Sequence, residues 1–142
     1  MRLLALLLLP IVVLAGCDLP KDPEGTSADV EGKVLRVGVL QPEPDPADRA
    51  AVEAVAEAFG AEVELIVGPA HDLIARLEGG ELHIVAGGIP ADTPFTEKAG
   101  LTRPFGTVMI GGQEKDRVLA IPKGENGFLA RIEHALPEME GN

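Results

Sequence analysis

The segment DLIARLEGGELHIVAGGIP, residues 72–90, decides the fold. Apolar residues recur at helical spacing up to residue 78, which predicts an amphipathic helix. The pair Gly79-Gly80 is expected to end that helix, because glycine adopts the left-handed conformation of a helix C-cap. Residues 82–86 are apolar and too few for a helix, as in a buried strand. The pair Gly87-Gly88 then predicts a sharp backbone turn.

The preceding sequence repeats this alternation of strand and helix. Residues 34–40 and 62–67 alternate apolar and polar side chains, so each predicts a strand. Residues 47–59 predict an amphipathic helix with one apolar and one charged face. Residues 69–78 predict the second helix. Strands that alternate with helices at this spacing predict a parallel sheet in the order two-one-three. Ligands collect at the carboxyl ends of such strands, so the Gly87-Gly88 loop is the first candidate site.

The remaining sequence departs from the alternation. Residues 88–104 contain three prolines and predict a long irregular loop. Two short strands at 107–110 and 117–121 are close enough in sequence to form an antiparallel pair. Residues 128–136 predict a last helix, which Pro137 ends. The expected fold is an α/β three-layer sandwich, with a parallel βαβαβ core, an antiparallel edge pair and a C-terminal helix.

Composition argues against several classes of function. The chain has 142 residues, enough for one domain, and a formal net charge of −11, which disfavours nucleic-acid binding. Its three histidines lack the spacing of a metal site, and its only serine is Ser27. His83 is expected to be a hydrogen-bonded core residue, and His71 with Asp72 to mark a helix start. No catalytic residue, metal or cofactor is therefore expected.

The N-terminus has the pattern of a processing segment. Residues 3–16 form an apolar run that is too short to span a membrane and suits a signal peptide over 1–16. The run ends in LAGC, which resembles the lipobox of bacterial lipoproteins. That resemblance implies cleavage before Cys17, acylation of its side chain and anchoring to a membrane. An ordinary secretory peptide with a chance cysteine is the alternative.

The next stretch lacks any apolar period. Residues 17–32 are rich in proline, charge and small polar side chains, so they predict a flexible tether before a folded lobe at 33–137. At about 3.1 Å per residue, an extended tether of this length would hold the lobe some 40 Å from the membrane. Residues 138–142 are expected to be a disordered tail.

Several motifs carry a family resemblance. LRVGV at 35–39, LEGGELHIVAGG at 77–88 and LTRPF at 101–105 follow one another in order. Together with RVLAIPKGEN at 117–126, they resemble the first lobe of bacterial extracellular solute-binding proteins of family 3, which serve ATP-binding-cassette importers. The resemblance implies a periplasmic-binding-protein type II fold that binds amino acids or similar small polar solutes without catalysis. It also implies a location in the cell envelope, facing the periplasm or exterior.

The chain also differs from that family. Only eleven residues separate Phe105 from Arg117, where the family has a whole second lobe. Phe95 falls where the family has the arginine that grips an amino-acid carboxylate, and His83 falls at a usual aspartate. The loop at 41–46 is short where the family has an aromatic platform.

Two classes of function therefore remain open. The first is a one-lobe solute-binding protein, whose ligand-binding residues we expect to be Gln41, Gly87, Gly88, Ile89, Thr93 and Phe105. The second is a degenerate lobe that binds no small molecule and instead docks a transporter permease or a second copy of itself. An exposed Phe95 beside an exposed Ile89 would favour this second class.

Overall fold

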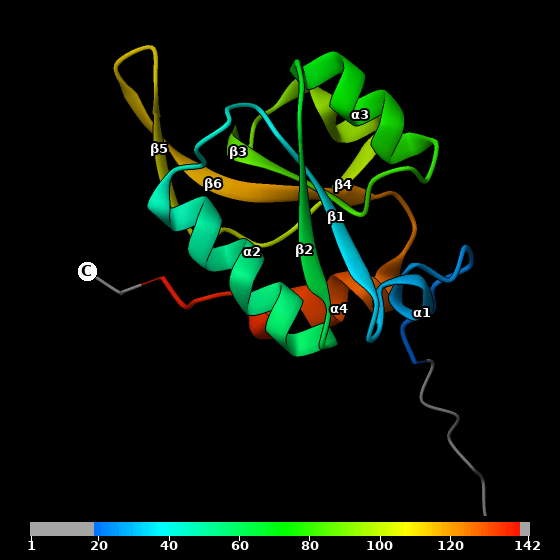
Figure 1. Cartoon of the computed structure of the whole chain (residues 1–142). Coiled ribbons are helices and arrows are strands. Elements are labelled where there is room, and N and C mark those ends of the chain that lie inside the picture. Colours follow the sequence, from blue (N-terminus) through cyan, green and yellow to red (C-terminus); the bar gives the residue numbers. More distant parts are fainter. Residues whose placement is uncertain (1–18, 140–142) are drawn as a thin grey trace, which may run out of the picture.

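A six-stranded sheet runs through the molecule in the order β2-β1-β3-β6-β4, and β5 pairs with β6 (Figure 1). The computed structural model describes residues 19–139, so the expected signal peptide at 1–16, Cys17 and residues 140–142 lie outside the described part. The elements are α1 (Thr26–Val30), β1 (Val34–Val39), α2 (Pro46–Phe59), β2 (Glu62–Val67), α3 (Ala70–Glu78), β3 (Ile84–Pro90), η1 (Pro94–Glu97), β4 (Ala99–Leu101), β5 (Gly106–Ile110), β6 (Gln113–Pro122) and α4 (Asn126–Ala135).

The parallel core is arranged as the sequence predicts. Strand β1 pairs in parallel with β2 on one side and with β3 on the other, which is the order two-one-three. Helices α2 and α4 cover one face of the sheet and α3 covers the other (Figure 1). Phe59 and Phe128 pack together on the first face, with ring centroids 5.3 Å apart. The three-layer α/β sandwich is therefore confirmed.

The antiparallel pair is also present, but β6 lies inside the sheet rather than at its edge. Strand β6 pairs with β3 on one side and with β4 and β5 on the other. Strands β5 and β6 are joined by Gly111 and Gly112, whose φ angles are 58° and 79°. Two successive positive φ angles define the type I′ hairpin turn, which matches the twist of the strands it joins. A two-residue turn thus stands where the resembled family has a second lobe.

The stretch 88–104, predicted to be an irregular loop, contains regular structure. Strand β3 continues to Pro90, the 3₁₀ helix η1 begins at Pro94, and β4 follows it. The prolines are tolerated because they occupy a strand end and the first position of a helical turn, where a missing N–H costs little. The expectation of a structureless loop is therefore wrong.

The described part of the predicted tether is folded. The carboxylate of Glu125 is buried and accepts the backbone N–H groups of Glu24 and Thr26, at 2.9 and 3.0 Å. Asp22 accepts the N–H of Phe128 at 2.7 Å, in the first turn of α4, and Val30 is fully buried in the core. Residues 21–32, which we call the N-terminal strap, are thus part of the lobe. A flexible tether over 17–32 and the 40 Å separation it would allow are wrong for this segment.

His83 joins the strap to the sheet. Its Nδ1 accepts the backbone N–H of Arg36 at 3.0 Å, and its Nε2 lies 2.9 Å from a carboxylate oxygen of Asp29 in α1. Burial lowers the pKa of His83, although hydrogen bonding to Asp29 opposes this effect. His83 is therefore the hydrogen-bonded core residue that the sequence predicts.

Replacing Glu125 with alanine should destabilise the lobe and release the strap. The buried N–H of Thr26 and the partly buried N–H of Glu24 lose a charged acceptor, so the free energy of unfolding should fall by about 2–3 kcal/mol. Circular dichroism can follow the thermal unfolding, and hydrogen exchange should show lost protection at residues 24 and 26. The matched change Glu57→Ala, on the exposed face of α2, should change stability by less than about 0.5 kcal/mol. Equal effects of the two substitutions would contradict this account.

Candidate functional site

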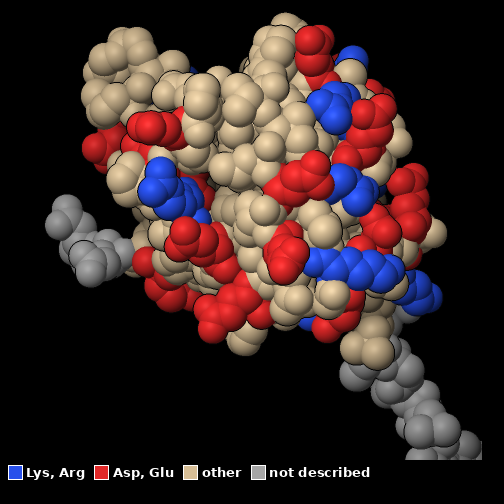
Figure 2. Space-filling model, in the orientation of Figure 1, with Lys and Arg blue, Asp and Glu red and all other residues tan. Residues whose placement is uncertain are grey.

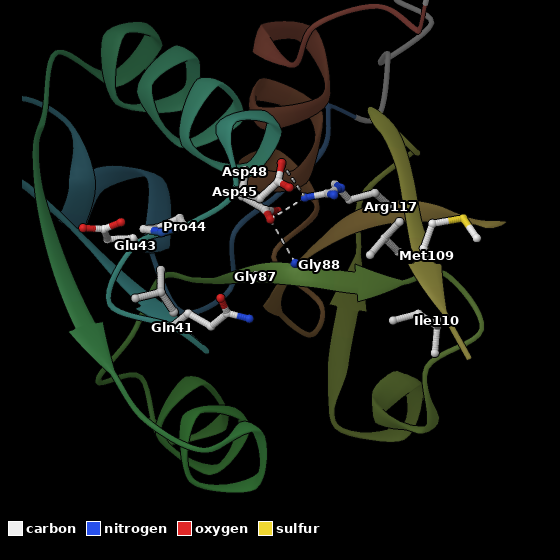
Figure 3. A pocket seen from close by; sticks show the side chains of 12 residues that line it. Gln41, Glu43, Pro44, Asp45, Asp48, Gly87, Gly88, Met109, Ile110 and Arg117 are labelled. Atoms are coloured by element: carbon white, nitrogen blue, oxygen red, sulfur yellow. Dashed lines mark hydrogen bonds and ion pairs between the residues drawn. The ribbon is translucent and has the colours of Figure 1, made fainter. Parts of the chain in front are cut away.

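A cavity of about 350 Å³ opens at the carboxyl ends of β1 and β3 (Figure 3). Its walls come from the loop after β1, the first turn of α2, the end of β3 and the β5–β6 hairpin. The lining residues are Val39, Gln41, Glu43, Pro44, Asp45, Asp48, Gly87, Gly88, Val108, Met109, Ile110 and Arg117. This is the position where open α/β sheets commonly bind ligands.

Two glycines shape the inner wall of the cavity. Gly87 and Gly88 have φ angles of 126° and 71°, and the pairing of β3 with β6 shifts register between Val85 and Ile89. A Cβ on Gly87 would lie 3.1 Å from Leu40, so the backbones approach too closely for a larger residue. Bulges of this kind redirect backbone groups beside functional sites. Here the bulge turns the N–H of Gly88 toward Asp48, at 3.0 Å.

A buried ion pair lies behind the glycines. Asp48, in the first turn of α2, is fully buried, and its Oδ2 lies 2.5 Å from Nη1 of Arg117 (Figure 3). Arg117 also donates from Nε to the carbonyl of Thr107 at 2.9 Å, and its Nη1 lies 3.3 Å from Asp45. The pair therefore joins α2 to β6, and through Thr107 to β5.

The environment of Asp48 is electrostatically unusual. Burial raises the pKa of this carboxyl group, while Arg117 and the backbone N–H groups of Gly87 and Gly88 oppose the rise. Its Oδ1 is buried and has no hydrogen-bond partner among residues 19–139. A buried acceptor without a donor is rare in folded proteins and needs an explanation.

The hairpin forms an apolar wall opposite the acids. Val108, Met109 and Ile110 line the cavity from β5, and Met109 remains 62% exposed. Figure 2 shows the hairpin standing out from the body of the molecule, with a notch beside it. Glu43 and Asp45 belong to the loop before α2, and both side chains are exposed. The cavity thus has one apolar side and one acidic side.

The residues expected from sequence divide into two groups. Gln41, Gly87 and Gly88 line the cavity. The other three lie elsewhere: Ile89 is buried beneath α3, Thr93 caps η1 and Phe105 is in the core under α2 and α4. The structure brings together only the first group.

Phe95 and Ile89 do not form an exposed patch. Ile89 is buried, and Phe95 is half-buried with its ring edge-to-face against His71, at a centroid distance of 5.5 Å. The arrangement that would favour a docking surface at this loop is therefore absent. Phe95 also lies outside the set of cavity-lining residues.

Sequence reasoning missed Asp48 and Arg117. Asp48 lies four residues before Val52 and seven before Val55, so it falls on the apolar stripe of α2. An acid on a buried helix face requires a partner, and this was the available signal. Arg117, at the start of the run RVLAI, gave no comparable sign.

The described residues contain neither a metal-binding cluster nor a membrane-spanning helix. Residues 19–139 contain no group of three or more His, Cys, Asp or Glu side chains that could hold a metal ion. In the same range, none of the helices has the length and apolar character needed to cross a bilayer.

Comparisons with known proteins identify the fold. A scan against protein-family models found no match, and neither did a search of curated proteins. Among solved structures, the arginine-bound form of domain 1 from TmArgBP is similar, with a TM-score of 0.61, 18% identity, and coverage of 72% of this chain and 90% of that chain. An ancestral arginine-binding protein bound to arginine has a TM-score of 0.58 and 14% identity, covering 72% and 90%.

A third similar structure is the L-cystine solute receptor of Neisseria gonorrhoeae in its unliganded open conformation. Its TM-score is 0.57 and its identity 13%, with coverage of 73% of this chain and 85% of that chain. At such identities the likeness concerns the fold. The chain has the fold of a single lobe of the periplasmic amino-acid-binding proteins, and the resemblance found in the sequence is confirmed at that level.

Replacing Arg117 with methionine should destabilise the protein strongly. The buried Asp48 carboxylate would lose its cation, which typically costs about 3–5 kcal/mol. The double variant Asp48→Asn/Arg117→Met should recover part of that loss, because no uncompensated charge stays buried. Urea unfolding followed by circular dichroism measures the free energies of unfolding of Arg117→Met, Asp48→Asn and the double variant. Simple additivity of the two single substitutions would show that the ion pair is not coupled as described.

Proposed function

We propose that this protein is a membrane-tethered, one-lobe solute-binding protein. It binds a small polar solute, without catalysis, in the cavity at the carboxyl ends of β1 and β3. The observation that carries the proposal is the combination of a cavity at this position with a buried charged pair and the two glycines of the β3 bulge in its wall. Cavities that bind small ligands commonly combine apolar walls with a few placed polar groups.

A single lobe is large enough for this role. The cavity volume of about 350 Å³ falls within the common range of ligand pockets, roughly 300–1,000 Å³. The similar structure of TmArgBP domain 1 has arginine bound to one domain of that protein. This supports binding without a second lobe. In our chain, Gln41, Gly87 and Gly88 from the predicted set line this cavity.

The N-terminal sequence and the fold support a biological setting in the cell envelope. We place the protein in the bacterial cell envelope, anchored through lipidated Cys17 and facing the periplasm or exterior. In that position it would present a solute to the permease of an ATP-binding-cassette importer. The fold of periplasmic amino-acid-binding proteins and the lipobox-like sequence before residue 17 support this setting.

A tryptophan reporter can test for solute binding. The chain has no Trp, so Met109→Trp on β5 would place a single indole at the cavity wall. Titration with amino acids, amines and small anions should change its fluorescence for one class of solute. The melting temperature of the unmodified protein should also rise when that solute is added. A ligand at one hundred times its Kd adds about 2.7 kcal/mol, or roughly 10 °C for a domain of this size.

The matched control is Met139→Trp, in the segment after α4 and outside the cavity lining. Its fluorescence should not respond to the same solutes. A cooperative melt that no solute shifts, with a silent Met109→Trp reporter, would refute binding at this cavity.

The anchor makes a separate prediction. Cys17→Ala removes the thiol that acylation requires, so the protein should move from the membrane fraction to the soluble fraction of cells. Metabolic labelling with a palmitate analogue should mark the unmodified protein and not the variant. An unchanged membrane fraction or undiminished labelling would rule out lipidation at Cys17.

Protein interaction is the second candidate function. The edge strand β2 leaves Val63, Leu65 and Val67 between 40% and 52% exposed, on the side that α2 covers only partly. An exposed apolar edge can pair with another chain. A permease or a second copy of this chain would then dock there. A silent solute titration together with dimers in sedimentation would favour this candidate.

A further inference from the structure

The charges around the cavity restrict which solute it can hold. Three carboxylates line it, from Glu43, Asp45 and Asp48, against the single cation of Arg117. Resting on the function proposed above, we infer that the solute is a small organic cation without a carboxylate, an amine or guanidine held by these acids. This class differs from arginine, bound in the structure of TmArgBP domain 1, and from L-cystine, the solute of the Neisseria gonorrhoeae receptor, because its members lack a carboxylate.

The one cation in the lining is already engaged. Arg117 donates to the Thr107 carbonyl from Nε and faces the Asp48 and Asp45 carboxylates from Nη1. Its side chain is almost wholly buried, so its charge is largely neutralised before a solute arrives. A solute carboxylate would therefore meet a net negative wall, which costs affinity.

Two backbone donors at or beside the cavity are engaged as well. The start of α2 would normally attract anions, but the Asp45 carboxylate accepts the N–H of Ala47 there, at 2.9 Å. The N–H of Gly88 is taken by Asp48. These two backbone donors are thus occupied by the chain's own acids.

One acceptor remains without a donor. Oδ1 of Asp48 is buried in the cavity wall and has no partner among the described residues. Leaving such an acceptor unpaired is costly. The atom has almost no accessible surface, so a bound ammonium or guanidinium would be attracted by the charge of the Asp48 carboxylate through the cavity wall rather than by a hydrogen bond to Oδ1. This unpaired oxygen distinguishes the wall from an acidic surface patch.

The opposite wall suits a hydrocarbon stem. Val108, Met109 and Ile110 line the cavity from β5, and Figure 3 shows Met109 and Ile110 on this strand. A cation on a short chain of methylene groups can place its charge at the acids and its stem along β5. Agmatine has this form, and arginine differs from it only by one carboxylate. The two compounds are a matched pair of probes.

Isothermal titration of the full chain in non-ionic detergent tests the inference. Agmatine should bind at least about tenfold more tightly than arginine, because arginine brings a carboxylate to a negative wall. Succinate should give no binding heat. Agmatine affinity should also fall as salt is raised, since the mouth of the cavity is exposed to solvent.

Two variants test whether agmatine binds beside the carboxylates of the cavity. Glu43→Gln, on the exposed loop, should weaken agmatine about threefold at low salt, and Asp48→Asn should weaken it more. Because Asp48→Asn can also affect folding, Glu43→Gln carries the test alone if the other variant fails to fold. Glu57→Gln makes the same charge change away from the cavity and should leave affinity unchanged.

The outcomes of these experiments distinguish the inference of a cationic solute from the proposed function of solute binding. Arginine binding as tightly as agmatine, or any binding of succinate that the Met109→Trp reporter detects, would overturn the cation inference and leave solute binding intact. Agmatine binding unaffected by both Glu43→Gln and a folded Asp48→Asn would also overturn it. Binding of no solute in either experiment would refute the proposed function and the inference together.

Discussion

The contact between the Asp48 carboxylate and the Arg117 guanidinium organises the open end of this lobe. It joins the first turn of α2 to β6, and Gly88 connects the same carboxylate to the end of β3. A buried ion pair contributes little net stability, but its loss on one side is expensive. The same atoms line the proposed binding cavity. Stability and the proposed recognition therefore depend on the same group, so a substitution there is expected to change both.

The Gly111-Gly112 turn joins β5 and β6 directly, within the lobe. A type I′ turn closes β5 onto β6 within two residues, so the strands form a hairpin rather than two crossings to another lobe. The hairpin supplies the apolar wall of the cavity. All cavity walls thus come from one lobe, and a solute bound there would meet groups that the fold has already positioned. Preorganised groups of this kind reduce the entropic cost of binding.

The spacing of apolar residues predicted the helices and strands in which burial alternates regularly along the chain. The stripes of α2 and α3 and the alternation of β1 and β2 were readable because burial imposes a regular spacing. The N-terminal strap was misread because its order comes from Glu125, about one hundred residues away. Asp48 and Arg117 were missed for the same reason: each is explained only by a distant partner. Half of the expected site residues line the cavity, and these are Gln41 and the two glycines that follow a predicted strand.

The strap also sets the direction in which the cavity faces. It is held against the lobe from Lys21, whose carbonyl accepts the N–H of Gly127, and it lies by the start of β1. The cavity lies where β1 ends, at the opposite end of the strand from the strap (Figure 1). Only four peptide steps separate residue 17 from residue 21, a reach of at most about 14 Å. An anchor at residue 17 would therefore keep the lobe close against the bilayer, with the cavity mouth pointing outward and free to receive solute from the bulk.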